Sequence, residues 1–194
     1  MSSDPYYAAQ DLNFGFFSSI RGLTQSLPSI YKCYIETDAS GAKSVYSMAP
    51  HFQEVHSIQL DSKTMAELKE NNTGDKVEYY SNSGSSLSSV TAISKRAGYD
   101  CIFYLNYNNY NRDADCLCQD YVSSIVRNCK KQVIVVIDSF GLVNDCFSTN
   151  GNHTEELQER IENSCGSRLS NSYTVGSKAG GRYRLVLHLN KVAE

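Results

Sequence analysis

The segment at residues 132–138, which reads QVIVVID, constrains the fold more than any other part of this chain. Residues 133–137 are all β-branched, and β-branched side chains favour extended backbone. The strand that they predict is apolar on both faces, which is typical of a central strand covered on both sides. We therefore expect a layered protein in which helices pack against a sheet.

From about residue 60 onward, helical and strand patterns alternate along the chain. The expected elements are helices near 62–72, 87–98, 113–131 and 154–166 and strands near 74–82, 99–107, 132–138, 170–175 and 182–189. The last two strands flank the turn sequence GSKAGG and form a hairpin. The sequence thus predicts an α/β fold, with alternating β-α units around a mainly parallel or mixed sheet and a C-terminal antiparallel hairpin.

The length of 194 residues suits one domain of ordinary size. We place a single α/β domain at 33–194 and an N-terminal helical arm at 1–32. The arm has an apolar stripe at helical spacing that either packs on the domain or meets a membrane surface or a partner. The stripe residues proposed for membrane contact are Leu12, Phe16, Phe17, Ile20 and Leu23.

The charge balance excludes one class of partner. The net charge is −3 and the pI is about 5.8, whereas nucleic-acid binders usually have a basic excess.

No window of 18 apolar residues exists, so we expect no membrane span. The N-terminus MSSDPYYAAQ also lacks the pattern of a signal peptide. This favours either a cytoplasmic protein or a secreted one in its mature form.

Seven cysteines leave the redox compartment open. Six of them lie on or beside two helices and could tether those helices to the sheet by disulfides, each worth about 2–4 kcal/mol. Equally, they could be buried thiols in a reducing compartment. The candidates are Cys101, Cys116, Cys118, Cys129, Cys146 and Cys165. Glycosylation sequons at Asn71 and Asn152 favour secretion.

The sequence has no clear metal or cofactor motif. His51 and His56 are five residues apart, whereas a metal-binding helix places its histidines four apart. Cys116 and Cys118 have no second cysteine pair at zinc-site spacing. The glycines of GSKAGG precede a strand rather than a helix, which does not suit phosphate binding. We therefore expect no metal and no cofactor.

Asp138 and Ser139 follow the central strand, where α/β proteins place their sites. With His188 on the last strand, they are the catalytic candidates of this sequence. The segment IDSFG, after the earlier strand FYLNY, resembles caspase-like peptidases, although the positions of the catalytic pair hold Asn106 or Tyr107 and Phe140. This resemblance implies an inactive, intracellular caspase-like or TIR-like domain that acts in protein–protein interaction.

A second resemblance rests on about the last 50 residues. There a cysteine, a polar helix, the Cys165-Gly166 step and a hairpin with a Gly-Gly turn follow one another. This order is similar to that of secreted fungal α/β-sandwich proteins of the yeast killer-toxin and effector type. It implies a secreted, non-enzymatic toxin or effector that acts on a surface component or membrane of a target cell, and it allows an oligomer. We therefore expect a secreted toxin or effector, with the intracellular interaction domain as the alternative.

Overall fold

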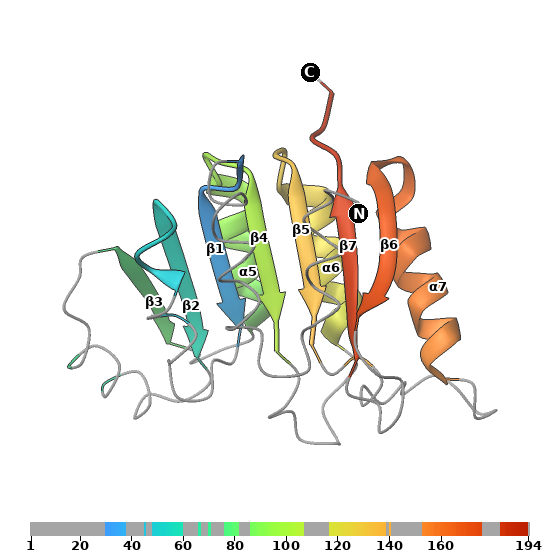
Figure 1. The fold of residues 1–194 in the computed structure, drawn as a ribbon, viewed down its shortest axis with the longest axis horizontal. Coiled ribbons are helices and arrows are strands. Elements are labelled where there is room, and N and C mark those ends of the chain that lie inside the picture. Colours follow the sequence, from blue (N-terminus) through green and yellow to red (C-terminus); the bar gives the residue numbers. More distant parts are fainter. Residues whose placement is uncertain are drawn as a thin grey trace, which may run out of the picture.

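The structure is a computed structural model. It describes residues 30–37, 45, 48–59, 66, 70, 76–81, 86–106, 117–138, 140, 153–175 and 183–193. Within them, seven strands form one sheet in the order β3-β2-β1-β4-β5-β7-β6 (Figure 1). The strands are β1 (Cys33–Thr37), β2 (Glu54–Gln59), β3 (Val77–Ser81), β4 (Cys101–Leu105), β5 (Val133–Ile137), β6 (Leu169–Val175) and β7 (Arg184–Leu189).

The sheet is mixed. The strands β1 to β5 all pair in parallel, whereas β7 pairs antiparallel with both β5 and β6. Every residue of β1, β4 and β5 is buried. The run of β-branched residues in β5 therefore lies in the middle of the sheet, between β4 and β7, as its two-sided apolar character predicts.

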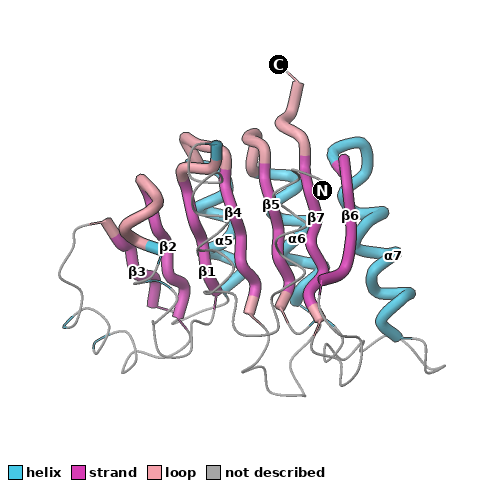
Figure 2. Tube along the Cα trace, in the orientation of Figure 1, coloured by secondary structure: helices cyan, strands magenta, loops and turns pink. Residues whose placement is uncertain are grey.

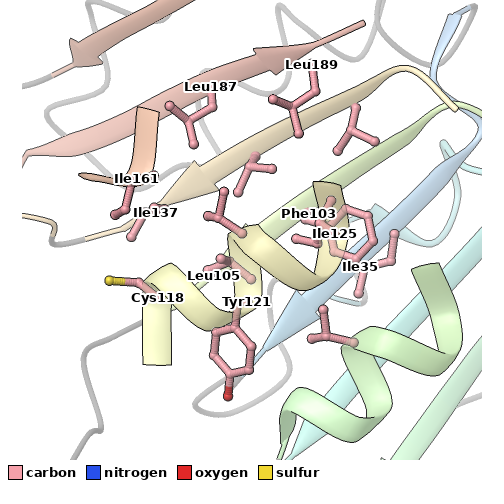
Figure 3. Close-up of a cluster of buried hydrophobic side chains, with 14 of the residues drawn as sticks. Ile35, Phe103, Leu105, Cys118, Tyr121, Ile125, Ile137, Ile161, Leu187 and Leu189 are labelled. Carbon is pink, nitrogen blue, oxygen red and sulfur yellow. The ribbon is translucent and has the colours of Figure 1, made fainter. Parts of the chain in front are cut away.

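Three helices cover one face of the sheet in the part of the chain that the structure describes: α5 (Ser86–Arg96), α6 (Leu117–Asn128) and α7 (His153–Cys165) (Figures 1 and 2). The odd-numbered residues of β1, β4 and β5 point toward them, so that Ile35, Phe103 and Ile137 pack in one core with Ile125 of α6 and Ile161 of α7 (Figure 3).

The opposite face of the sheet has a core of its own. Tyr34, Ile102 and Ile134 pack there with Met48 and Phe52, which precede β2. The face is therefore apolar along most of its length, and the polar side chains that interrupt it stand out.

The step from α7 into β6 has a local cause. Gly166 follows the last residue of α7 with φ 55°, the left-handed conformation that favours glycine after a helix. A short 3₁₀ turn, η3 (Gly166–Arg168), leads from it into β6. Arg168 donates hydrogen bonds to the carbonyl oxygens of Val126 and Cys129, both at 2.7 Å, and so ties this turn to the end of α6.

The predicted α/β class, the mixed sheet and the C-terminal antiparallel hairpin are thus confirmed. The N-terminal arm with its apolar stripe lies outside the described residues, so the division at residues 32 and 33 stays a prediction. Among the helices that the structure describes, none is both long and apolar enough to cross a membrane.

The disulfide interpretation is wrong for the cysteines among the described residues. Four of the six candidates, namely Cys101, Cys118, Cys129 and Cys165, are buried free thiols, as is Cys33. They pack as small apolar side chains in the core beneath the helices. Cys116 and Cys146, and the sequon residues Asn71 and Asn152, lie outside the described residues.

Thiol titration of the denatured, unreduced protein should therefore detect at least five free cysteines. In the native protein Cys165 should react slowly at pH 8, because burial raises its pKa to about 11 and leaves only about one thiolate in a thousand there. The readout is the colour yield with a disulfide reagent, and a reduced sample serves as the control. A count below five in denaturant would contradict the free-thiol structure.

Candidate functional site

The strand order reverses between β1 and β4. From β1 the chain moves outward to β2 and β3, whereas from β4 it moves the other way to β5. In open α/β sheets the connections leave such neighbouring strands in opposite directions, and ligands bind in the crevice outside their carboxyl ends. We therefore expect a binding site at the carboxyl ends of β1 and β4.

Glu36 lies near the carboxyl end of β1 and is 2% exposed. It points away from the helices, toward the face that holds Tyr34, and the Tyr34 hydroxyl donates a hydrogen bond of 3.3 Å to its Oε2. Burial, and then the charge of Glu36, raise the pKa of Tyr34 well above its usual value. The phenol of Tyr34 therefore keeps its proton at neutral pH and remains a donor to the carboxylate.

Tyr104 of β4 is the register partner of Glu36 across the β1–β4 pairing. Its pKa is raised by burial first and then by the charge of Asp138, with which it also shares a hydrogen bond. The neutral hydroxyl of Tyr104 therefore lies between the carboxylate of β1 and the carboxylate that follows β5.

Asp138 is bound by the cation at the start of β7. Arg184 Nε donates a hydrogen bond of 2.7 Å to Asp138 Oδ1, and the two side chains are only 14% and 13% exposed. Burial alone would lower the pKa of Arg184, but its electrostatic interactions and hydrogen bonds with Tyr104 and Asp138 outweigh that effect and raise the pKa. The guanidinium is therefore charged and compensates the charge of Asp138.

The ends of β1 and β4 are also joined directly. The Asn106 backbone N–H donates a 3.1 Å hydrogen bond to Thr37 Oγ1, and both residues are buried.

We name Tyr34, Glu36, Tyr104, Asp138 and Arg184 the polar row. Its two carboxylates and one guanidinium give it a formal charge of −1. It is a buried cluster with two acidic side chains and one guanidinium, at the switch point of a mostly apolar face.

Of the three catalytic candidates from the sequence, Asp138 alone belongs to the polar row. His188 stacks on Tyr173 with ring centroids 5.6 Å apart. In the register of β5 and β7, His188 pairs with Ile134. Ile134 comes four residues before Asp138, so His188 and Asp138 are separated by about 13 Å along the strand direction. Ser139 lies outside the described residues. The structure therefore does not bring Asp138 and His188 together as a catalytic pair.

Sequence reasoning missed Glu36, Tyr34, Tyr104 and Arg184. One signal was available, namely an acidic residue within the apolar strand IYKCYIET, directly before a predicted turn. In α/β folds, ligands bind at the carboxyl ends of the strands. A carboxylate at that position therefore indicates a binding group.

Comparisons with solved structures place the fold. The O-methyltransferase from Bacillus cereus in complex with SAH matches with a TM-score of 0.62 and 14% identity, over 96% of this chain and 87% of that chain. The O-methyltransferase TomG from Streptomyces achromogenes, involved in tomaymycin synthesis and in complex with SAM, matches with a TM-score of 0.60 and 16% identity, over 98% and 91%. The N-methyltransferase NodS from Bradyrhizobium japonicum with S-adenosyl-L-homocysteine gives 0.57 and 11%, over 99% and 94%.

At these identities the likeness shows the fold alone, which is a Rossmann-like methyltransferase fold. No protein-family model and no curated protein sequence matches this chain. The matches overturn the resemblance to fungal killer-toxin and effector proteins, because the C-terminal hairpin is the antiparallel edge of a seven-stranded sheet that β1 to β5 complete.

The functional expectations drawn from that resemblance are corrected as well. A non-enzymatic toxin or effector with a target-cell surface partner is contradicted, because the structural neighbours are enzymes that bind SAM or SAH. The alternative of a caspase-like or TIR-like interaction domain is not supported either.

The Asp138–Arg184 pair can be tested by a double-mutant cycle. Arg184→Met should lower the free energy of unfolding by about 3–5 kcal/mol, because it leaves a buried carboxylate without its cation. Combining it with Asp138→Asn should cost less than the sum of the two single changes. Urea unfolding measures all three.

Arg96→Met is the matched control, since its ion pair with Glu78 is exposed and should change stability by about 0–1 kcal/mol. An Arg184→Met protein that unfolds at the wild-type urea midpoint would show that the pair does not form.

Proposed function

We propose that this chain is an S-adenosylmethionine-dependent methyltransferase that acts on a small-molecule hydroxyl. One observation carries the proposal, namely the negatively charged polar row at the β1–β4 switch point. The proposal is also supported by the fold that this chain shares with SAM- and SAH-bound neighbours, two of which are O-methyltransferases. The proposal replaces the expectation of a protein without a cofactor.

The charge of the polar row fits such a ligand. S-Adenosylmethionine has a sulfonium, an ammonium and one carboxylate, so it is a net cation. The row has one formal negative charge, and low-dielectric surroundings strengthen its attraction for a cation. The rings of Tyr34 and Tyr104 add electron-rich faces that attract cations.

The sequence after β1 fits a ligand without phosphates. The dinucleotide fingerprint has three glycines there, because the backbone must approach a pyrophosphate closely. Here the residues after Thr37 read DASGAK and include a single glycine, Gly41. S-Adenosylmethionine has no phosphate group, so the loss of those glycines removes a requirement that this ligand does not impose.

In this proposal Glu36 holds the cofactor by accepting hydrogen bonds from its donor groups, and Tyr34 orients the Glu36 carboxylate. Asp138 is already bound by Arg184, so it is unsuited to a second strong cation and instead keeps Tyr104 in place. Burial of the row excludes water from one side of the site. The bound cofactor would supply an electrophilic methyl group.

Binding of S-adenosyl-L-homocysteine to the full chain, followed by calorimetry, tests the proposal. Glu36→Gln should weaken binding about 10- to 100-fold, because it replaces a charged acceptor whose hydrogen bonds are worth about 1.5–3 kcal/mol. Glu159→Gln, at an exposed carboxylate of α7, should bind as the wild type does.

Loss of binding counts only for a variant with the wild-type circular dichroism spectrum. A folded wild-type chain that binds neither S-adenosylmethionine nor S-adenosyl-L-homocysteine would remove the proposed function.

A further inference from the structure

A second cluster of polar side chains lies at the opposite, amino-terminal edge of the same strands. Cys33 begins β1, Glu54 begins β2, and the two are register partners. His56 follows on β2, on the same face as Glu54. One ligand atom from each of these residues, a sulfur, a carboxylate oxygen and a ring nitrogen, lies within 4.8 Å of the other two.

His56 is held with one nitrogen occupied and the other directed at Glu54. Its Nδ1 is 3.2 Å from the Tyr80 hydroxyl and 3.5 Å from Glu78 Oε2, whereas its Nε2 is 3.7 Å from Glu54 Oε2. Metal-binding histidines usually have their second nitrogen fixed by such a hydroxyl or carboxylate partner. Tyr80 and Glu78 therefore orient the ring so that Nε2 is available.

The distance from Nε2 to Glu54 Oε2 is too long for a hydrogen bond but suits two ligands of one ion. Zinc bonds of about 2.0–2.2 Å at a tetrahedral angle separate a nitrogen and an oxygen ligand by about 3.4 Å. The observed 3.7 Å is within a few tenths of an ångström of that separation. We propose that Cys33, Glu54 and His56 bind a zinc ion at the amino-terminal edge of the sheet.

The chemistry of the three ligands matches zinc. Thiolate, imidazole and carboxylate are the ligands that this ion takes in proteins, and they suit magnesium or calcium poorly. A thiolate and a carboxylate also neutralise a divalent cation, so the loaded site has no net charge to bury.

The site has one open side. Cys33 is fully buried and His56 is 4% exposed, whereas the Glu54 side chain is 43% exposed and gives an ion a path from solvent. Cys101 adjoins the site, because its thiol shares a hydrogen bond with Cys33. His51, the other half of the histidine pair in the sequence, is not among the ligands; the other two ligands come from β1 and from the same strand as His56.

This site is separate from the polar row, so its test does not depend on the proposed function. The full chain is first treated with a chelator and then titrated with Co²⁺, which reports thiolate ligation through a sulfur-to-metal charge-transfer band. One equivalent of Co²⁺ should bind with that band, Zn²⁺ should displace it, and Zn²⁺ should raise the melting temperature.

The ligand variants are Cys33→Ser, His56→Gln and Glu54→Gln, of which the last changes a half-exposed side chain and is the least disruptive to folding. Each should weaken Co²⁺ binding at least about tenfold, and Cys33→Ser should abolish the charge-transfer band. The matched controls, Cys165→Ser and His188→Gln, change a buried thiol and a buried histidine outside the site and should bind as the wild type does.

A folded wild-type chain without the charge-transfer band would overturn the proposal. So would a band that survives Cys33→Ser, or folded Glu54→Gln protein with wild-type Co²⁺ affinity.

Discussion

The parallel pairing of β1 with β4 is the constraint on which the rest of the structure depends. Its register runs from Cys33 opposite Cys101 to Thr37 opposite Leu105. A slip by one residue would turn every side chain to the other face. It would place Glu36 among the apolar residues beneath the helices and remove Ile35 from that core. The same apolar contacts that hold the sheet together thus fix the position of the buried carboxylate.

Burying that carboxylate opposes folding, since a charged group that leaves water loses its hydration. The polar row offsets part of this cost through the Tyr34 hydroxyl and through Arg184, which compensates the second carboxylate. An apolar residue at position 36 would avoid the cost entirely. A costly polar cluster in a face that is otherwise apolar is the kind of local inconsistency expected at a functional site.

The sequence predicted the parts of the fold that follow from local periodicity. The β-branched run of β5 predicted a central strand, and the GSKAGG turn predicted the hairpin of β6 and β7. The burial of Glu36 was not predictable in this way, because it depends on β4, which pairs with β1 from almost 70 residues away. Periodicity in one strand cannot show which residues of another strand will cover a polar side chain.

The toxin-like interpretation failed for a related reason. The resemblance rests in part on the Cys165-Gly166 step, but each residue of that step has a local cause. Cys165 packs as a small apolar side chain at the end of α7, and Gly166 supplies the positive φ that ends the helix.

The two proposed sites lie on opposite faces of the sheet, which also has a local cause. Cys33 and Glu36 are three residues apart on β1, so their side chains point to opposite faces of the sheet. An ion on Cys33 cannot reach a ligand held by Glu36 and can act on it only through the backbone of β1. The proposed metal site would therefore bear on the stability of the strand that positions the polar row, and the proposed chemistry belongs to the polar row alone.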